Sequence, residues 1–569
     1  MTGTYSGQWR ASILVSLGVI LGCFGLAVIT TYPLVYEISS HLVGVSEMHD
    51  SAIFAWNNWW IRHALVGLHG HAPYLTDYVL VPFPVDLRLH PLGLLYGLVS
   101  IPLLSFLSPL ALVNLQILAT PVLNGYSVFR LVRKWAARDS VAALCGLAIA
   151  ASPAINFHLA KGRPSCAALW AVALSLLFLI QLIEAPGLWN CVGLAGSLLA
   201  LLLIDQQMTL FGLVIFSLYL IWTFIAHPRS ILDRRLWLSL SAIAVVVSYP
   251  IRLLYVRPFL QTSGYSAPDP SEALFFSVSP SQLVAPHQLW LRYGALLPLG
   301  FVASLLVAPS ERRARFPIFA GLVCVALTLG PQMHGTDIPL PFGLLRMLPG
   351  FGQFRTPYRF QIPAALAMAA ALAAALTAVL ARLERGSSRQ RFPRIVLGAV
   401  LLLIVGDAIA SRVVRGFATH LVADEPIYRR IAKTPGDFLV LEVPFGVQSG
   451  TDHIGRGDDL MFHQTVHAKR MINGFLGRVP LVAFDYYRKS QALLFLGDEP
   501  FRSEDLVADF NSKLRSLDVG FIVVHPEMLS ADRSGAVLSF LRERRDLTEI
   551  STGTRSLAFR VGGDLPALE

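Results

Sequence analysis

The chain has 569 residues, of which 54% are hydrophobic and only 14% are charged. This composition excludes an ordinary soluble globular protein and predicts an α-helical polytopic membrane protein, because the charges are clustered between long apolar runs. The formal net charge of +10 does not indicate nucleic acid as a partner, since much of it lies in short loops between those runs.

Eleven apolar runs are long enough to cross a bilayer, and a shorter run over residues 92–107 is ambiguous. The eleven runs begin near Ala11, Leu112, Val141, Cys166, Leu188, Met208, Leu236, Tyr293, Pro317, Phe360 and Ile395. If residues 92–107 do not cross and the N-terminus is cytoplasmic, four basic clusters all face the cytoplasm. These clusters are residues 130–138, 229–235, 311–315 and 382–394.

This positive-inside pattern predicts the domain organisation. Residues 1–412 are expected to form a transmembrane domain in the inner (cytoplasmic) membrane, with a first outside loop at residues 32–110. Residues 413–569 are expected to form an extracytoplasmic domain. The first apolar run has no convincing cleavage site, so it is expected to be a retained span.

The segment after residue 412 is more polar and predicts an α/β domain with its own core. Residues 437–443 (DFLVLEV) and 519–524 (VGFIVV) indicate buried strands, and residues 547–561 indicate a hairpin with Gly553 in the turn. Residues 503–517 indicate a helix, and Pro426 is expected to begin another.

Asp50 lies in the first outside loop, directly before the stretch SAIFAWNNWWIRHAL. On a helical wheel the apolar arc carries Trp56, Trp59 and Trp60, so we expect a helix lying flat in the bilayer interface. A carboxylate held there can act as a general base on an acceptor hydroxyl. The alternative is that Asp50 or Ser51 only caps the helix, and the two roles can coexist.

Four histidines lie in or beside the outside loops: His49, His63, His90 and His158. No HxxxH or HExxH spacing links them, so a structural or interfacial role is the alternative to metal binding. A divalent metal is left open, and no other cofactor is indicated. His90, followed by Pro91, is the best candidate among them for contact with phosphate or sugar.

Two pairs of basic residues lie at the outside face. Arg355 and Arg359 stand four apart in PGFGQFRTPYRF, where a helix begins, and a guanidinium fork binds phosphate oxygens with two hydrogen bonds. Lys161 and Arg163, in HLAKGRP, are outside against the positive-inside trend. The alternative for the arginine pair is that both side chains anchor the helix at the interface.

These blocks together resemble a known family. The stretches HDSAIFAWNNWWIRHAL, YLTDYVLVPFPVDLRLHPLG and NGYSVFRLVRKWAARDSVAALCGLAIAASP resemble those of bacterial GT-C-type glycosyltransferases, as do PGFGQFRTPYRF, LEVPFG and HQTVHAKRMINGFLGRVP. The family includes protein O-mannosyltransferases and the aminoarabinose transferases that act on lipid A. The resemblance covers nearly the whole chain and is more specific for architecture than for substrate.

The resemblance implies a polyprenyl-phosphate-linked sugar donor, a glycan, lipid or protein acceptor, and an acidic base in the first outside loop. Asp50 matches that base, although its neighbour is His49 rather than a second acid. The implied substrate contacts are Arg355, Arg359, His90, Lys161, Arg163 and His63. A non-catalytic protein for transport or assembly of lipid-linked glycans is the alternative, which would favour charges inside several spans.

Overall fold

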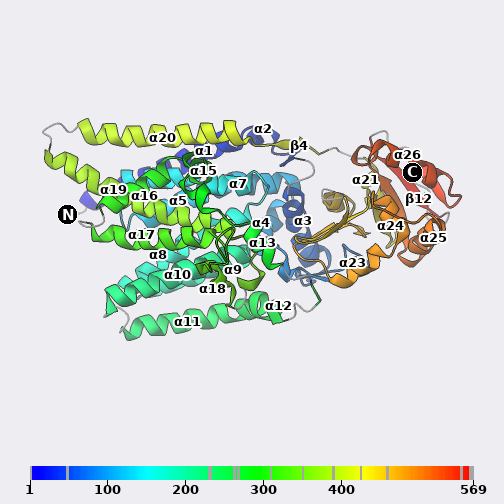
Figure 1. Cartoon of the computed structure of the whole chain (residues 1–569), viewed down its shortest axis with the longest axis horizontal. Coiled ribbons are helices and arrows are strands. Elements are labelled where there is room, and N and C mark those ends of the chain that lie inside the picture. Colours follow the sequence, from blue (N-terminus) through cyan, green and yellow to red (C-terminus); the bar gives the residue numbers. More distant parts are fainter. Residues whose placement is uncertain are drawn as a thin grey trace. The chain divides into compact units, whose positions relative to one another are not determined.

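The computed structural model describes most of the chain and separates it into two compact units (Figure 1). The helical unit comprises Met1–Ile38, Asn114–Phe259 and Pro268–Thr419, and the mixed unit comprises Ser39–Val113, Leu260–Ala267 and His420–Glu569. The described residues are 3–45, 50–228, 233–260, 264–265, 269–307, 311–348, 351–386, 391–422, 426–456, 460–550 and 555–562.

Each of the eleven expected spans contains a helix. They are α1 (Gly3–Thr31), α5 (Pro109–Val132), α6 (Asp139–Ala150), α8 (Leu169–Glu184), α9 (Leu188–Ile204), α10 (Gln206–Ala226), α11 (Arg234–Ile251), α16 (Leu296–Val307), α17 (Arg315–Thr328), α19 (Gln361–Gly386) and α20 (Arg391–Arg415). The expected architecture, a polytopic helical protein with a mixed C-terminal sheet, is therefore confirmed.

The number of full-length spans is smaller than eleven. Among the described residues, seven helical stretches are long and apolar enough to cross a bilayer. An eighth is possible only as a bent pair, α15 (Pro286–Tyr293) with α16, which turns by 108°. Helices α8 and α9 have 16 and 17 residues and α17 has 14, so an apolar run in the sequence overstates the length of the helix within it.

Small residues set the packing inside the helical unit. Helix α19 is rich in alanine, is buried along most of its length, and contacts α16 and α17. Helices α5 and α6 approach at Gly125 and Gly146, where an added Cβ on Gly146 would lie 2.5 Å from the Gly125 carbonyl oxygen. Close approach of backbones is the usual way in which helices gain van der Waals contact in a membrane.

The ambiguous run contains helix α4 (Leu94–Leu103), which has ten residues. Such a helix is about 15 Å long, roughly half of the ~30 Å hydrocarbon core of a bilayer. It packs against α3 (Ser51–Arg62) within the mixed unit. Its length agrees with the expectation that this run does not cross.

A five-stranded sheet forms the centre of the mixed unit. Its order is β11 (Leu547–Ile550), β12 (Leu557–Val561), β10 (Val519–Val524), β5 (Leu439–Val443) and β8 (Arg470–Met471). Strand β10 is parallel to β5 and antiparallel to β12, and all residues of β5 and β10 are buried. The expected strands, the hairpin and the helices α21 (Pro426–Lys433) and α25 (Leu506–Ser516) are confirmed, whereas Gly553 lies outside the described residues.

The C-terminal segment has one buried cluster of its own, which includes Tyr428, Phe438 and Phe521, and it shares a larger cluster with the first loop. One cluster of buried side chains joins residues of the first loop, including Trp56, Val79 and Leu87, to residues of the sheet, including Leu441 and Ile522. In Figure 1 the blue helix α3 accordingly lies beside the yellow strands of the C-terminal segment. The first loop and the C-terminal segment therefore form a single folding unit.

Helix α3 is not an interfacial helix with its indoles in lipid, as its sequence suggested. Trp56 and Trp60 are fully buried in the shared core and stack with their ring centroids 5.7 Å apart. The expected polar face is also covered, since Asn57 and Asn58 are 1% and 2% exposed. An amphipathic pattern shows that one face needs apolar cover, but here protein supplies that cover in place of the bilayer.

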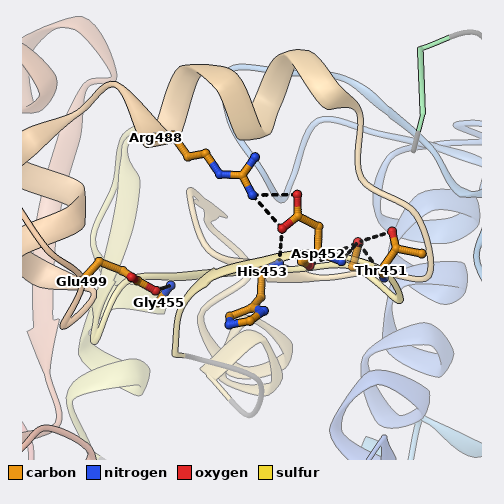
Figure 2. A network of polar contacts seen from close by, with 7 residues as sticks. Thr451, Asp452, His453, Gly455, Arg488 and Glu499 are labelled. Carbon is orange, nitrogen blue, oxygen red and sulfur yellow. Dashed lines mark hydrogen bonds and ion pairs between the residues drawn. The ribbon is translucent and has the colours of Figure 1, made fainter. Parts of the chain in front are cut away.

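A polar network fixes the hairpin of β6 (Gly446–Gln448) and β7 (His453–Gly455), as Figure 2 shows. Asp452 accepts two hydrogen bonds of 2.6 Å from Arg488, the last residue of α23 (Leu481–Arg488). The Gly455 N–H donates to Glu499 at 2.9 Å, at a glycine with a positive φ of 64°. These bonds hold the hairpin against the helices that follow it.

Candidate functional site

The seven residues expected to bind or react with substrate are divided between the two units. Asp50, His63 and His90 belong to the mixed unit, whereas Lys161, Arg163, Arg355 and Arg359 belong to the helical unit. His49 lies outside the described residues.

Asp50 immediately precedes α3 and is half-buried. Its carboxylate accepts no hydrogen bond from the first turn of the helix, although its backbone carbonyl accepts the N–H of Phe54 at 3.1 Å. The neighbouring Ser51 hydroxyl donates to the Val43 carbonyl at 2.7 Å instead of capping. The alternative in which the Asp50 side chain caps the helix is therefore not seen, because its carboxylate makes no hydrogen bond to the first turn.

The His90 ring connects α3 to the C-terminal segment through hydrogen bonds of both ring nitrogens. Its Nδ1 accepts the N–H of Gly477 at 2.8 Å, and its Nε2 lies 2.9 Å from the Asn57 Oδ1. Because Nδ1 accepts, Nε2 carries the proton and donates to Asn57. Burial lowers the pKa of His90 to about 3, although the charge of Asp50 opposes that shift. Both ring nitrogens are occupied, so the expected contact with phosphate or sugar would have to break one of these bonds.

His63 lies at the end of α3, where the chain continues as one π-helical turn, η1 (His63–Gly67). Its ring stacks on Trp59 with centroids 4.7 Å apart and meets the edge of Tyr78 at 5.0 Å. Its Nε2 is buried and has no hydrogen-bond partner among the described residues. Burial lowers its pKa, so the imidazole is neutral at pH 7.

In the helical unit, aromatic and basic side chains gather around Tyr358 in the short turn η9 (Pro357–Phe360). The ring of Tyr358 is parallel to that of His158 at 6.3 Å between centroids, and it lies 6.4 Å from that of Phe276. The backbone N–H of Tyr358 donates to the Phe276 carbonyl at 3.2 Å. This turn therefore links the start of α19 to α7 (Pro153–Leu159) and α13 (Pro270–Phe275).

Arg359 is the basic residue most closely bound into this cluster. Its Nη1 donates to the Gln207 Oε1, and its Nε lies 3.5 Å from the Tyr358 hydroxyl. Asp205, which caps α10 by accepting the N–H groups of Gln207 and Met208, interacts electrostatically with Arg359. A guanidinium held from several sides in this way is preorganised to receive an anion.

Arg355 is paired with an acid. Its Nη1 lies 2.8 Å from the Glu272 Oε2, and its guanidinium lies over the ring of Phe276 at 5.7 Å. Each side chain of the pair is about one-quarter exposed to solvent. The structure thus places Arg355 at the edge of the Tyr358 cluster, through Phe276.

Lys161 and Arg163 lie in the turn that ends α7. Gly162 has a positive φ of 71°, and the N–H groups of Lys161 and Arg163 both donate to the His158 carbonyl, at 3.2 and 3.0 Å. Such a left-handed glycine is the usual way to end a helix and satisfy its last carbonyls. The charge of Arg163, like that of Arg359, acts on the His158 ring.

The structure adds Arg292 and Arg415, which the sequence did not single out, and it shows the surroundings of His158, one of the four histidines considered above. His158 is fully buried, and neither of its ring nitrogens has a hydrogen-bond partner among the described residues. Arg292 interacts electrostatically with Tyr358 and Arg415, and Arg415 lies over the ring of Phe157 at 5.9 Å. The sequence signals for His158 were its place beside an expected outside loop and its proximity to the KGR turn.

We call this group the Tyr358 cluster and define it by its members Arg163, His158, Arg292, Arg355, Tyr358, Arg359 and Arg415. The cluster contains five arginines, some of which are linked to Tyr358 only through a neighbouring side chain, and Glu272 pairs directly with Arg355. Guanidinium groups are the side chains that bind phosphate oxygens with paired hydrogen bonds. Within the described part of the chain, no three His, Cys, Asp or Glu side chains are grouped to hold a metal ion.

Comparisons with known proteins agree with this architecture. No protein-family model and no curated protein sequence matches the chain. The apo oligosaccharyltransferase of Archaeoglobus fulgidus superposes with a TM-score of 0.52 at 13% identity, covering 90% of this chain and 70% of that one. The same enzyme in complex with Zn and sulfate gives a TM-score of 0.51 at 13% identity, covering 97% and 74%.

Arabinofuranosyltransferase AftD from Mycobacteria superposes with a TM-score of 0.54 at 15% identity. The match covers 98% of this chain but only 40% of AftD, so the present chain spans less than half of that enzyme. At such identities the likeness concerns the fold alone. The chain has the fold of the GT-C glycosyltransferases.

Proposed function

We propose that the protein is a membrane glycosyltransferase. It moves a sugar from a polyprenyl-phosphate donor to a glycan, lipid or protein acceptor at the outer face of the cytoplasmic membrane. The single observation that carries the proposal is the Tyr358 cluster, in which five arginines gather in a helical unit with the GT-C fold. A polyprenyl phosphate is the membrane-borne anion that such a cluster would receive.

In this reaction the acceptor hydroxyl attacks C1 of the sugar from the face opposite the phosphate, which inverts the configuration. The bond between C1 and the phosphate oxygen breaks, and the polyprenyl phosphate leaves with the electron pair. Asp50 takes the proton of the acceptor hydroxyl as the new C1–O bond forms. Arg355 and Arg359 offset the negative charge that grows on the departing phosphate.

A non-catalytic protein for transport or assembly of lipid-linked glycans is the second candidate. That function would use charged groups inside the spans. Asp407, which lies inside α20, instead accepts hydrogen bonds from the Trp290 indole and from the backbone N–H groups of Ala295 and Leu296. This carboxylate therefore supports the bend between α15 and α16, which favours the transferase.

The test uses the full-length protein in lipid nanodiscs with a panel of synthetic polyprenyl-phosphate sugars, and it measures release of polyprenyl phosphate. Asp50→Asn should fold normally and lose transfer, because an amide cannot accept the proton. Full activity of Asp50→Asn would remove the base assignment. Each assay is run with and without a chelator, since the related oligosaccharyltransferase is known in complex with Zn.

The phosphate assignment is tested separately. Arg359→Ala should cost on the order of 1.5–3 kcal/mol of transition-state stabilisation, roughly a tenfold to hundredfold loss in kcat/KM. Arg359→Lys should restore little of the lost kcat/KM, because an ammonium cannot reproduce the two parallel hydrogen bonds of a guanidinium. If Arg359 and Arg355 are only interfacial anchors, both Lys variants will show wild-type turnover and donor affinity.

A further inference from the structure

The helix that follows Asp50 is held by residues from the other end of the chain. The Trp56 indole N–H donates to the Gln464 Oε1 at 2.7 Å, across 408 positions. The Gln464 amide nitrogen in turn donates to the carbonyls of Tyr78 and Lys469, at 2.7 and 2.8 Å. Gln464 is fully buried in α22 (Gln464–His467), so its amide connects α3, the first loop and the C-terminal segment.

A second contact lies one residue further along α3. The Asn57 Oδ1 accepts from His90, whose other ring nitrogen accepts the Gly477 N–H. Asn57 also donates to the Pro91 carbonyl at 3.0 Å. A Cβ on Gly477 would lie 2.9 Å from the Pro91 Cδ and 3.1 Å from the Leu89 carbonyl oxygen, so only glycine lets the two loops approach this closely.

Both contacts are close to Asp50 along a rigid element. Trp56 and Asn57 follow Asp50 by six and seven residues, which is about 10 Å along an α-helix. A shift of α3 at these positions is therefore passed on to the carboxylate. Asp50 directly precedes Ser51, the first residue of α3, so a displacement of the helix also displaces the backbone that carries this carboxylate.

We propose that Gln464 and Gly477 are positioning residues for the Asp50 carboxylate, acting through Trp56 and through the His90–Asn57 pair. The proposal rests on the function proposed above, in which Asp50 is the base. The C-terminal segment then contributes to catalysis by fixing the geometry of a base that lies some 400 positions earlier, whether or not it also binds an acceptor. An error of about 1 Å in such a group can cost on the order of a hundredfold in rate.

The test compares Gln464→Leu with a matched control, Tyr487→Phe. The Tyr487 hydroxyl is fully buried in the same core and donates to the Val81 carbonyl at 3.0 Å, but Tyr487 does not lie on α3 or α22. Each substitution removes buried hydrogen bonds from one core, whereas only Gln464→Leu releases α3. Gly477→Ala is the second test variant, because it displaces the His90 contact without removing a buried amide.

In both test variants we expect kcat to fall roughly ten- to hundredfold with KM within about twofold of wild type. Amide hydrogen exchange over residues 51–62 should also rise. The Tyr487→Phe control should leave kcat and that exchange near wild type. A merely structural role predicts that the test variants and the control lose stability alike while kcat per folded molecule stays unchanged.

The outcomes separate the two proposals. Wild-type kcat in Gln464→Leu and Gly477→Ala, beside an inactive Asp50→Asn, overturns the positioning role and leaves the base assignment intact. Full activity of Asp50→Asn overturns both. Unchanged exchange over residues 51–62 in both test variants also overturns the positioning role, and this measurement needs no donor. A double variant Trp56→Phe with Gln464→Leu should be no slower than Gln464→Leu alone, because the two share one bond.

Discussion

Arg355 and Glu272 form an ion pair within the helical unit, with 2.8 Å between Nη1 and Oε2. The carboxylate thus occupies one edge of a guanidinium that we assign to the donor phosphate. Two anions that share one guanidinium compete, and the strength of this competition can be measured.

Replacing Glu272 with Gln should therefore tighten donor binding. The pair is partly exposed, so its contribution is about 0.2–1 kcal/mol, and the donor KM should fall by roughly 1.5- to 5-fold. Steady-state kinetics with the polyprenyl-phosphate donor checks this. Asp139→Asn is the matched control, because it breaks the 2.9 Å pair with Arg133 elsewhere in the helical unit and should leave KM unchanged. A raised KM in Glu272→Gln would show that the pair only orders Arg355.

The mixed unit should lose stability in mild acid. Burial lowers the pKa values of His90 and His467 to about 3, and burial together with the neighbouring His525 and His467 lowers that of His463. Below the ordinary value of 6.5, the unfolded chain binds protons that the folded chain does not, so the free energy of unfolding falls as the pH falls.

The size of this effect follows from the shift. Each histidine contributes about 1.36 kcal/mol per pH unit, or about 2 kcal/mol between pH 6.5 and pH 5. Thermal unfolding of the nanodisc-embedded protein across this range checks the sign. His467→Gln removes one such group, so the number of protons taken up on unfolding should fall by about one and the slope of stability against pH should decrease. A Tm that rises toward pH 5 would contradict the assignment.

The glycine contact between α5 and α6 should not tolerate a methyl group. An added Cβ on Gly146 would lie 2.5 Å from a backbone oxygen of Gly125, so Gly146→Ala should destabilise the protein by about 1–3 kcal/mol. Gly18→Ala is the same substitution in α1, where nothing lies within 4 Å, and it should be neutral or slightly stabilising. Equal melting temperatures for the two variants would count against this close approach.

The C-terminus is expected outside the cytoplasm. This topology requires that all eleven expected runs cross the bilayer and that α4, with its ten residues, does not. A reporter that is active only in the periplasm, fused after Glu569, should be active. Activity of a cytoplasmic reporter at the same place would mean that residues 92–107 do cross, and the sides assigned to all later loops would reverse.

Strands and helices with a strong local pattern were predictable. The run that became β5 is rich in leucine and valine, the run that became β10 is rich in valine, and both form fully buried strands where they were expected. The hairpin of β11 and β12 and the helix beginning at Pro426 also followed from local signals. Local sequence decides these elements, because their patterns need no knowledge of a distant partner.

What covers an apolar face was not predictable. The indoles of α3 indicated a bilayer surface, yet Trp56 contacts Gln464, which is 408 positions away. The same limit applies to the Tyr358 cluster, since His158, Arg292 and Arg359 come from three separate parts of the chain. The partners of His90 were not predictable for a related reason, because Asn57 and Gly477 are brought to it by the fold.

The shared core of the mixed unit also affects how the protein is made. Trp56 emerges from the ribosome 408 residues before the glutamine that accepts its N–H. At about 5–20 residues per second, this interval lasts roughly 20–80 s. Throughout it, the indoles of Trp56 and Trp60 lack the strands that finally bury them. The apolar aromatic face of α3 must therefore be protected from aggregation until the C-terminal segment has been synthesised.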